Sequence, residues 1–375
     1  MRIGIPAETR AGETRVAATP ETVKKLAAGG HHQVLVQAGA GAGASILNAH
    51  FQAAGATIVG TAADLYAGAD IVLKVRGPSG DELAQMKKDS ILVGLLDARS
   101  PGTPDTLARQ GITAFSLELL PRISRAQSMD VLSSQANLGG YKAVMLAANT
   151  YGRMMMMLMT AAGTVKAARV IIMGVGVAGL QAIATAKRLG AVVEATDVRP
   201  ETKEQVESLG GKFIEVPLTD AEKELATGQG GYAREMGDDY KERQSALVAD
   251  RIKQADIIIT TALIPGRPAP VLVTEDMVKS MKPGSVIVDM AVEAGGNCPL
   301  SELDKTVVKH GVTLIGIANL PALVAADASA LYARNVLTFL GVLLDAKTGA
   351  LTINRDDEIV AGTLVCIGGE VAKKS

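Results

Sequence analysis

The segment that most constrains the fold of this chain is a glycine-rich turn, Gly174-Val175-Gly176-Val177-Ala178-Gly179. It follows an apolar run at residues 170–173 and precedes a stretch at 180–189 that is typical of a helix. In such a strand–turn–helix unit the first glycine permits a tight turn, the second lets the backbone approach a pyrophosphate, and the third lets helix and strand pack closely. Free N–H groups at the start of the helix favour the anion. The turn therefore predicts dinucleotide binding.

Asp197, at the end of the next predicted strand, indicates which dinucleotide binds. It stands eighteen positions after Gly179, where a carboxylate accepts hydrogen bonds from the hydroxyl groups of the adenosine ribose. Its negative charge would repel a 2′-phosphate, so the sequence favours NAD(H) over NADP(H). Arg199, two positions later, leaves NADP(H) open, because an arginine can bind a 2′-phosphate.

Short aliphatic runs alternate with helix-like segments along the chain, which predicts βαβ units and parallel sheets. In the N-terminal region we expect strands at residues 2–5, 33–37, 71–75, 91–96 and 112–115. A helix is expected there from the capping pair Thr19-Pro20 to the pair Gly29-Gly30. Further along we expect strands at residues 169–173, 192–196, 212–215, 257–261, 286–289 and 313–315, enough for a complete doubly wound dinucleotide-binding domain.

The length of 375 residues suggests two domains, each able to bury its own core. Long helices are expected near residues 132–148 and 323–344, and the second could return the chain to the first domain. The predicted fold class is therefore α/β, with two Rossmann-like domains and parallel sheets. The first is discontinuous, built from residues 1–133 and 320–375, and the NAD(H)-binding domain covers residues 134–319.

The composition excludes several other classes of protein. The chain has 38 basic and 39 acidic residues, which gives no reason to expect binding to nucleic acid or to an anionic membrane surface. Its two cysteines, Cys298 and Cys366, offer neither a CxxC spacing nor a disulfide framework, which fits a reducing compartment. Apolar stretches at 170–186 and 328–344 fall short of the ~20 predominantly apolar residues that a spanning helix needs.

Two further segments are unusual. A methionine run at residues 154–157 and 159 is interpreted as filling a junction between the domains, because flexible thioether side chains suit irregular gaps. No histidine or cysteine accompanies it, so no metal site is expected. The long polar connection at residues 217–240 contains Gly230-Gly231-Tyr232 and no obvious strand, which is typical of either a lid or a surface excursion.

The catalytic groups usual in dehydrogenases are scarce. The only histidines, His31, His32, His50 and His310, are all expected at the surface or in turns, which favours hydride transfer without a coupled proton transfer. The segment from Pro121 to Asp130, with Ser133, is instead dense in arginine, amide, carboxylate and hydroxyl groups. It joins the two predicted domains, so it is either a ligand site that fixes a carboxamide and a ribose or a polar hinge.

Together these segments resemble the NAD(H)-binding α subunits of proton-translocating NAD(P) transhydrogenases. The resemblance spans nearly the whole chain and is most specific around Arg122–Asp130. The motifs that carry it are Arg15-Val16-Ala17, Pro121–Asp130, Gly174–Gly179, Asp197-Val198-Arg199, Gly230-Gly231-Tyr232, Thr261-Ala262-Leu263-Ile264-Pro265-Gly266 and Glu293-Ala294-Gly295-Gly296-Asn297-Cys298-Pro299.

The resemblance implies roles for particular residues. Around the nicotinamide and its ribose it places Arg122, Ile123, Ser124, Gln127, Ser128, Met129, Asp130 and Ser133. Among these, Gln127, Arg122 and Asp130 would act in the reaction, with Gln127 reaching toward the partner nucleotide. Val175, Gly176 and Val177 would meet the pyrophosphate between Gly174 and Gly179, and Asp197, Val198 and Arg199 the adenosine end. The pocket would be completed by Gly231, Gln244 and Leu263, with Tyr232 on a mobile loop that closes over it.

The resemblance also implies partners. Such a component docks, usually as a homodimer, onto a membrane-embedded proton channel and a separate NADP(H)-binding component, and hydride passes directly between the two nicotinamides. Some α chains continue into transmembrane helices. This one stops at Ser375, so its anchor is expected to be another polypeptide, with the chain in the cytoplasm, attached peripherally to the inner face of the membrane.

Two other interpretations stay open. Alanine dehydrogenases are similar in plan and hold a substrate carboxylate with basic groups, for which Arg15 and Lys74 are suitably placed. Against this, the stretch Leu95-Leu96-Asp97-Ala98 lacks the histidine of that family, and Glu293 replaces its aspartate. A non-catalytic NAD-binding module would explain the glycine turn but leave the segment at 122–130 without a purpose.

Overall fold

The computed structural model describes residues 1–199, 201–216, 238–263, 266–345 and 347–372. The chain divides into two compact units. Unit 1 consists of Met1–Gln135 and Pro321–Ser375, and unit 2 of Ala136–Leu320. The sequence had suggested divisions at 133/134 and 319/320. Each unit is an α/β body with a mainly parallel sheet, and the first is discontinuous, as predicted.

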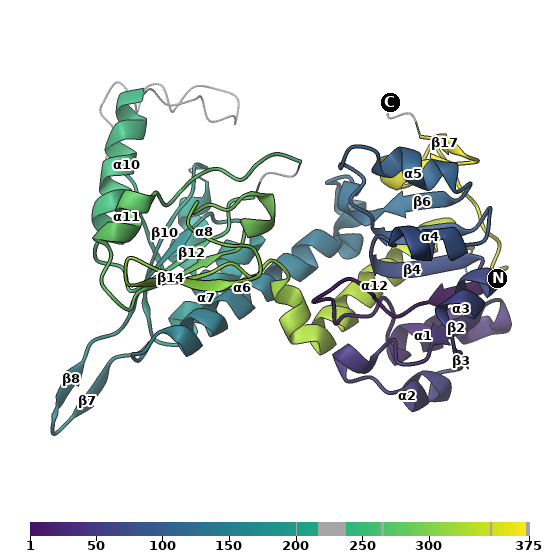
Figure 1. The fold of residues 1–375 in the computed structure, drawn as a ribbon, viewed down its shortest axis with the longest axis horizontal. Coiled ribbons are helices and arrows are strands. Elements are labelled where there is room, and N and C mark those ends of the chain that lie inside the picture. Colours follow the sequence, from purple (N-terminus) through teal and green to yellow (C-terminus); the bar gives the residue numbers. More distant parts are fainter. Residues whose placement is uncertain (200, 217–237, 264–265, 346, 373–375) are drawn as a thin grey trace. The chain divides into compact units, whose positions relative to one another are not determined.

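Unit 1 contains an eight-stranded sheet in the order β17-β16-β6-β5-β4-β1-β2-β3. The strands from β1 to β6 are parallel, whereas β16 pairs antiparallel with both β6 and β17. Figure 1 shows these last two strands beside the N-terminal part of the sheet. The strands are β1 (Arg2–Ile5), β2 (Gln33–Gln37), β3 (Ala56–Val59), β4 (Ile71–Arg76), β5 (Ile91–Leu95), β6 (Thr113–Ser116), β16 (Leu364–Ile367) and β17 (Glu370–Val371).

The helices of unit 1 cover this sheet. They are α1 (Pro20–Ala27), α2 (Asn48–Ala53), α3 (Ala62–Gly68), α4 (Gly80–Gln85), α5 (Thr103–Arg109), α12 (Ala325–Leu343) and α13 (Glu358–Thr363). Helix α1 starts as predicted, with Thr19 as N-cap and proline in its first turn. Helix α12 belongs to the core, because Phe339 packs edge to face on Phe115 at 5.6 Å between ring centroids. The division between units falls within α6 (Val131–Thr150).

Unit 2 contains a seven-stranded sheet in the order β11-β10-β9-β12-β13-β15-β14, parallel except for β14. Apart from the antiparallel edge, this is the 3-2-1-4-5-6 order of a doubly wound dinucleotide-binding fold. Its strands are β9 (Arg169–Met173), β10 (Val192–Thr196), β11 (Lys212–Phe213), β12 (Ile257–Thr260), β13 (Val286–Asp289), β14 (Thr306–Lys309) and β15 (Val312–Ile315). Its helices include α7 (Val177–Arg188), α8 (Thr202–Ser208), α10 (Asp238–Ile252) and α11 (Glu275–Ser280).

The strands predicted from the sequence are all present, with shifts of one or two residues at some ends. Helix α7 begins at Val177 rather than residue 180, because Gly179 already lies in its first turn. Strands β3 and β14 were not predicted. Both lie at sheet edges, where fewer side chains are buried and the apolar signal is weak.

The interpretation of the methionine run is wrong. The run leads into a two-stranded hairpin, β7 (Leu158–Thr160) and β8 (Gly163–Val165), which Figure 1 shows reaching away from the sheet of unit 2. Met155 alone is buried, while Met157 and Met159 are 61% and 71% exposed. The spacing of methionines does not distinguish a filled gap from an exposed apolar surface, since thioethers suit both.

Candidate functional site

The glycine turn connects β9 to α7 and has three glycines with different surroundings. Gly174 has φ +98°, a left-handed conformation that favours glycine. A Cβ on Gly179 would lie 2.0 Å from the carbonyl oxygen of Gly174, so only glycine lets helix and turn approach this closely. Gly176, the N-cap of α7, would place a Cβ in open space. The backbone is therefore bare at the point where α7 presents its free N–H groups.

Helix α6 packs against the same turn through a residue that the sequence did not single out. A Cβ on Gly140 would lie 2.1 Å from the carbonyl oxygen of Ala178, so the two segments are in backbone contact. A glycine in the middle of a helix usually costs stability. Its position is explained here by the close approach of α6 to the first turn of α7.

Asp197 follows β10 and is bonded to the turn itself. Its Oδ2 accepts a hydrogen bond from the backbone N–H of Val175 at 2.6 Å. The guanidinium of Arg199 donates to both carboxylate oxygens, at 2.9 and 3.1 Å. Burial raises the pKa of the Asp197 carboxyl, but the bonds from Arg199 and the backbone outweigh it, so the pKa is lowered. Asp197 therefore presents a charged carboxylate beside the glycine turn.

Two more predicted pocket residues lie in this unit. Gln244 on α10 donates from Nε2 to Thr196 Oγ1 at the end of β10 and to the carbonyl of Ile214. Within the described part of the chain, its buried Oε1 has no hydrogen-bond partner. Leu263 follows β12 and is exposed, and Val198 is exposed as well. Gly231 and Tyr232 lie outside the described residues.

The polar segment predicted at 122–133 lies in unit 1. It forms a 3₁₀ turn, Ser124–Met129, followed by α6. The turn is fixed by the buried side chains of Ala126 and Met129 and by Asn335 on α12, which donates to the carbonyl of Ser128 at 2.8 Å. The side chains left exposed include those of Arg122, Ser124, Gln127 and Ser128, while that of Ile123 is half-buried. Because Met129 faces the core, only its backbone is accessible to a ligand.

Asp130 and Ser133 form the start of α6. The carboxylate of Asp130 accepts hydrogen bonds from the backbone N–H and the hydroxyl of Ser133, at 2.9 and 2.5 Å. This is the arrangement of an N-capping carboxylate, which satisfies a free N–H of the helix. Both side chains are half-buried. Arg125, next to the predicted site residues, is instead paired with Asp357 at 2.7 Å.

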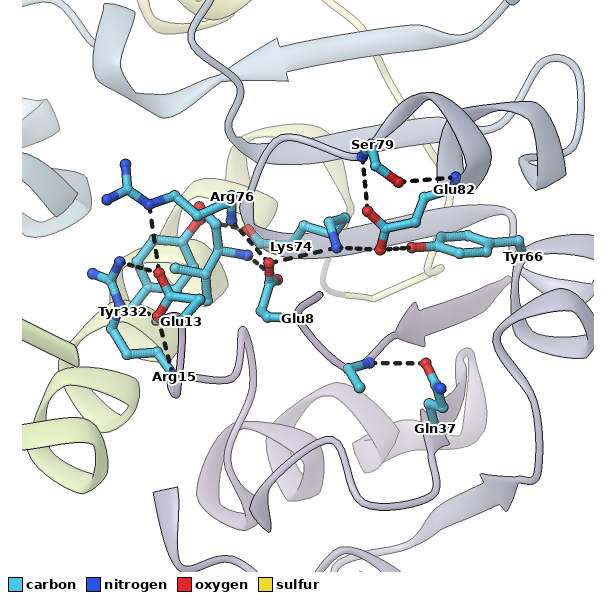
Figure 2. A network of polar contacts seen from close by, with 12 residues as sticks. Glu8, Glu13, Arg15, Gln37, Tyr66, Lys74, Arg76, Ser79, Glu82 and Tyr332 are labelled. Atoms are coloured by element: carbon cyan, nitrogen blue, oxygen red, sulfur yellow. Dashed lines mark hydrogen bonds and ion pairs between the residues drawn. The ribbon is translucent and has the colours of Figure 1, made fainter. Parts of the chain in front are cut away.

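Arg15 and Lys74 belong to a network of charged side chains in unit 1 (Figure 2). Arg15 donates to both oxygens of Glu13, at 2.7 and 2.6 Å, and to Oε1 of Gln135 at 2.8 Å. Lys74 Nζ lies 2.9 Å from Glu82 Oε1 and 3.5 Å from Glu8 Oε2. The charged side chains of the network are almost completely buried. The basic groups suited to a substrate carboxylate are thus paired with carboxylates of the chain.

The two carboxylates beside Lys74 differ in their pKa. Burial raises the pKa of Glu8 above its ordinary value, against the attraction of Lys74 and two backbone N–H groups. Burial acts on Glu82 in the same direction, but Lys74, Ser79 and the Tyr66 hydroxyl outweigh it and its pKa is lowered. Glu82 is therefore the firmer counter-ion of Lys74.

In the described ranges no helix is long and apolar enough to cross a membrane. Within the same part of the chain, no three histidine, cysteine, aspartate or glutamate side chains gather as a metal site would require.

Comparison with known proteins links both units to one family. The family model "Alanine dehydrogenase/PNT, N-terminal domain" matches residues 4–139, and "Alanine dehydrogenase/PNT, C-terminal domain" matches residues 143–374. An NAD(P) transhydrogenase subunit alpha of Rhodospirillum rubrum is 55% identical over 377 residues, covering 99% of this chain and 97% of that protein. Alanine dehydrogenase of Mycobacterium tuberculosis is 33% identical, covering 86% and 82%. The crystal structure of transhydrogenase from Sinorhizobium meliloti has a TM-score of 0.89 at 50% identity, covering 99% of this chain and all of that one.

Proposed function

Because this chain belongs to the alanine dehydrogenase/PNT family, whose two models together match residues 4–139 and 143–374, we propose that it is the NAD(H)-binding component of a proton-translocating NAD(P) transhydrogenase. The observation that carries the proposal is the bare glycine turn with the Asp197 carboxylate bonded to it. The identity of 55% to a transhydrogenase α subunit supports it over the other members of the family.

The residues at the turn suit NAD(H). The open space at Gly176 and the N–H groups of α7 would accept the pyrophosphate, with Val175 and Val177 beside it. Asp197 would accept hydrogen bonds from the adenosine ribose and disfavour a 2′-phosphate. Gln244 has a buried acceptor oxygen without a described partner, which a ligand donor would satisfy.

In the proposed reaction, hydride passes directly between NAD(H) on this chain and NADP(H) on a partner component (the Re/Si-specific transhydrogenase activity), so the chain acts only with its partners. Arg122, Gln127, Asp130 and Ser133 would orient the nicotinamide and its ribose. Positioning is then the main contribution of the protein, because hydride transfer requires the reacting atoms to approach to ~3–3.5 Å. No histidine or other general base needs to be present for this step.

The paired charges of unit 1 weigh against the alanine dehydrogenase alternative. A substrate carboxylate would have to compete with Glu13 for Arg15, and with Glu82 and Glu8 for Lys74. Breaking buried ion pairs is costly unless the new anion satisfies the same donors. Together with the missing histidine at 95–98, this favours the transhydrogenase component.

The test is a turnover assay with and without an NADP(H)-binding partner. We expect NADH to bind the isolated chain, with no hydride transfer until the partner is added. In the reconstituted complex, Gln127→Asn should slow the hydride-transfer step and leave NADH affinity nearly unchanged, because the shortened amide no longer positions the rings. Unchanged turnover would remove that role from Gln127. NADH oxidation by pyruvate and ammonia without a partner would replace the proposal with the dehydrogenase.

We extend the proposal to a homodimer attached peripherally to the cytoplasmic face of a membrane through its partner subunits. The hairpin of β7 and β8 supports self-association, since Met156, Met157, Leu158 and Met159 expose apolar surface together. Light scattering should give the mass of a dimer. Replacing Met157 and Met159 together by serine should shift it toward the monomer, and a monomeric mass for the unaltered chain would exclude the dimer.

A further inference from the structure

Asp289 organises a buried loop at the end of β13. This fully buried carboxylate accepts hydrogen bonds from the backbone N–H groups of Ala291, Asn297 and Cys298, at 3.0–3.1 Å, and from Thr260 Oγ1 at 3.2 Å. A Cβ on Gly296 would lie 2.7 Å from Asp289 Oδ2, so glycine is needed for the loop to wrap this closely. Because a buried carboxylate is costly unless its oxygens are satisfied, the loop and the carboxylate stabilise each other.

The loop in turn places the side chain of Asn297, which is also fully buried. Its Oδ1 accepts from the backbone N–H of Ala262 at 3.1 Å, and its Nδ2 donates to the carbonyl of Ala262 at 2.9 Å. The second N–H donates to the carbonyl of Pro270 at 2.8 Å. The amide thus pairs with both backbone groups of Ala262, as a neighbouring strand would.

Ala262 stands between Asn297 and the glycine turn. The preceding residue, Thr261, donates from its backbone N–H to the carbonyl of Met173 and from its hydroxyl to the carbonyl of Gly174, both at 2.8 Å. The next residue, Leu263, is exposed. A continuous series of hydrogen bonds therefore runs from Asp289 through Asn297 and the segment 261–262 to Gly174.

From this series we infer that Asn297 is a positioning residue of the dinucleotide site, acting through Ala262 and Thr261 on the glycine turn without touching the cofactor. The inference rests on the proposed function for its ligand. Asn297 is suited to the task because one planar amide satisfies an N–H and two carbonyls at once, which neither a hydroxyl nor a carboxylate does. Each lost bond would leave a buried backbone group unpaired.

The test compares Asn297→Ala with Asp256→Asn. Asp256 is also buried, lies at the opposite end of the same strand β12, and bonds the backbone N–H of Arg169 and Lys282 Nζ. Both changes should lower stability. Only Asn297→Ala should accelerate amide hydrogen exchange in the segments 261–263 and 174–179, and it should weaken NADH binding about tenfold, the effect of losing one or two well-placed hydrogen bonds. Equal effects of the two variants on exchange and affinity would overturn the inference.

Thr261→Val supplies a second variant, in case Asn297→Ala does not fold. It removes only the hydroxyl bond to Gly174 and keeps the shape of the side chain, so we expect a loss of NADH affinity of about fivefold. An unchanged affinity would break the series at that link. Hydrogen exchange is measured without ligand. If the unaltered chain bound no NADH, the proposed function would fail, while the exchange comparison would still decide whether Asn297 orders the turn.

Discussion

The two units place the same elements around their first strands but end those strands differently. In both sheets the first six parallel positions follow the order 3-2-1-4-5-6, with β1 and β9 as the central first strands. Two residues after β1, the backbone N–H of Ala7 donates to Gln37 at the end of β2, at 2.9 Å (Figure 2). Two residues after β9, the N–H of Val175 donates to Asp197 at the end of β10. Unit 1 thus has a neutral amide where unit 2 has a carboxylate.

The next position in each turn shows why only one unit is suited to a dinucleotide. Three residues after β1 stands Glu8, whose oxygens accept from the backbone N–H groups of Val75 and Arg76 and lie near Lys74. Three residues after β9 stands Gly176, with open space beside it. Unit 1 therefore supplies its own anion at the end of its central strand, whereas unit 2 leaves that position free. The same architecture becomes a charged core in one unit and a ligand site in the other.

The largest effect is expected from breaking the charged core. Lys74→Met leaves the buried Glu8 and Glu82 without their shared cation, which should lower the free energy of unfolding by ~3–5 kcal/mol. Urea denaturation measures this change. NADH affinity of the folded variant should stay unchanged, and a parallel loss of affinity would show that the two units do not have separate roles.

The next change makes unit 2 resemble unit 1. Gly176→Glu places a carboxylate where the pyrophosphate is expected, in open space and with an extended backbone of φ −82° that any residue adopts. NADH affinity should fall at least about a hundredfold, or ~2.7 kcal/mol, with little change in stability. Gly176→Gln is the matched control for size, and isothermal titration calorimetry compares the two. Equal losses for Glu and Gln would mean that bulk rather than charge excludes the ligand.

A smaller effect is expected from Asp197→Asn, which gives unit 2 the neutral amide of Gln37. NADH binding should weaken by ~1.5–3 kcal/mol, the value of a hydrogen bond to a charged group. Discrimination against NADPH should shrink in the same variant. If the unaltered protein bound NADH and NADPH equally well, the assignment of the cofactor would be lost.

The smallest effect concerns pH. The pKa of Glu8 is raised by burial, so its contribution to stability is fully present below about pH 4.5 and is lost as the pH rises through the folded-state pKa. Glu82 has a lowered pKa and contributes in the opposite direction, losing its contribution as the pH falls. Between pH 4.5 and 7, Glu8→Gln should therefore gain stability relative to the unaltered protein, by ~1.4 kcal/mol for each pH unit that separates the folded-state pKa of Glu8 from its unfolded value. A constant difference across that range would contradict the raised pKa.

Local patterns were sufficient for the parallel cores and the glycine turn. Strands such as β9 and β12 are buried on both faces and therefore appear as continuous aliphatic runs. Gly174, Gly176 and Gly179 are recognisable because their spacing follows from one turn of backbone. Edge strands, the exposed hairpin and the pairing of Arg15 with Glu13 depend on which segments meet in three dimensions.

Asn297 and Gly140 were missed for the same reason. Asn297 bonds to residues 35 positions away, and Gly140 contacts a turn nearly forty residues later. Their only sequence signals are an asparagine after a glycine pair and a glycine inside a long helix. Neither signal has a single structural meaning without the fold.

The discontinuity of unit 1 affects how the protein is made. During synthesis, residues 1–135 leave the ribosome before α12 and β16, which complete their core and the edge of their sheet, even exist. All of unit 2 is translated in between, and it is contiguous in sequence. Although N-terminal domains generally fold first, here the middle of the nascent chain can finish folding while the first unit still exposes apolar surface. The final step is then the closure of a very long loop, whose entropic cost the already folded unit 2 reduces by bringing its ends together.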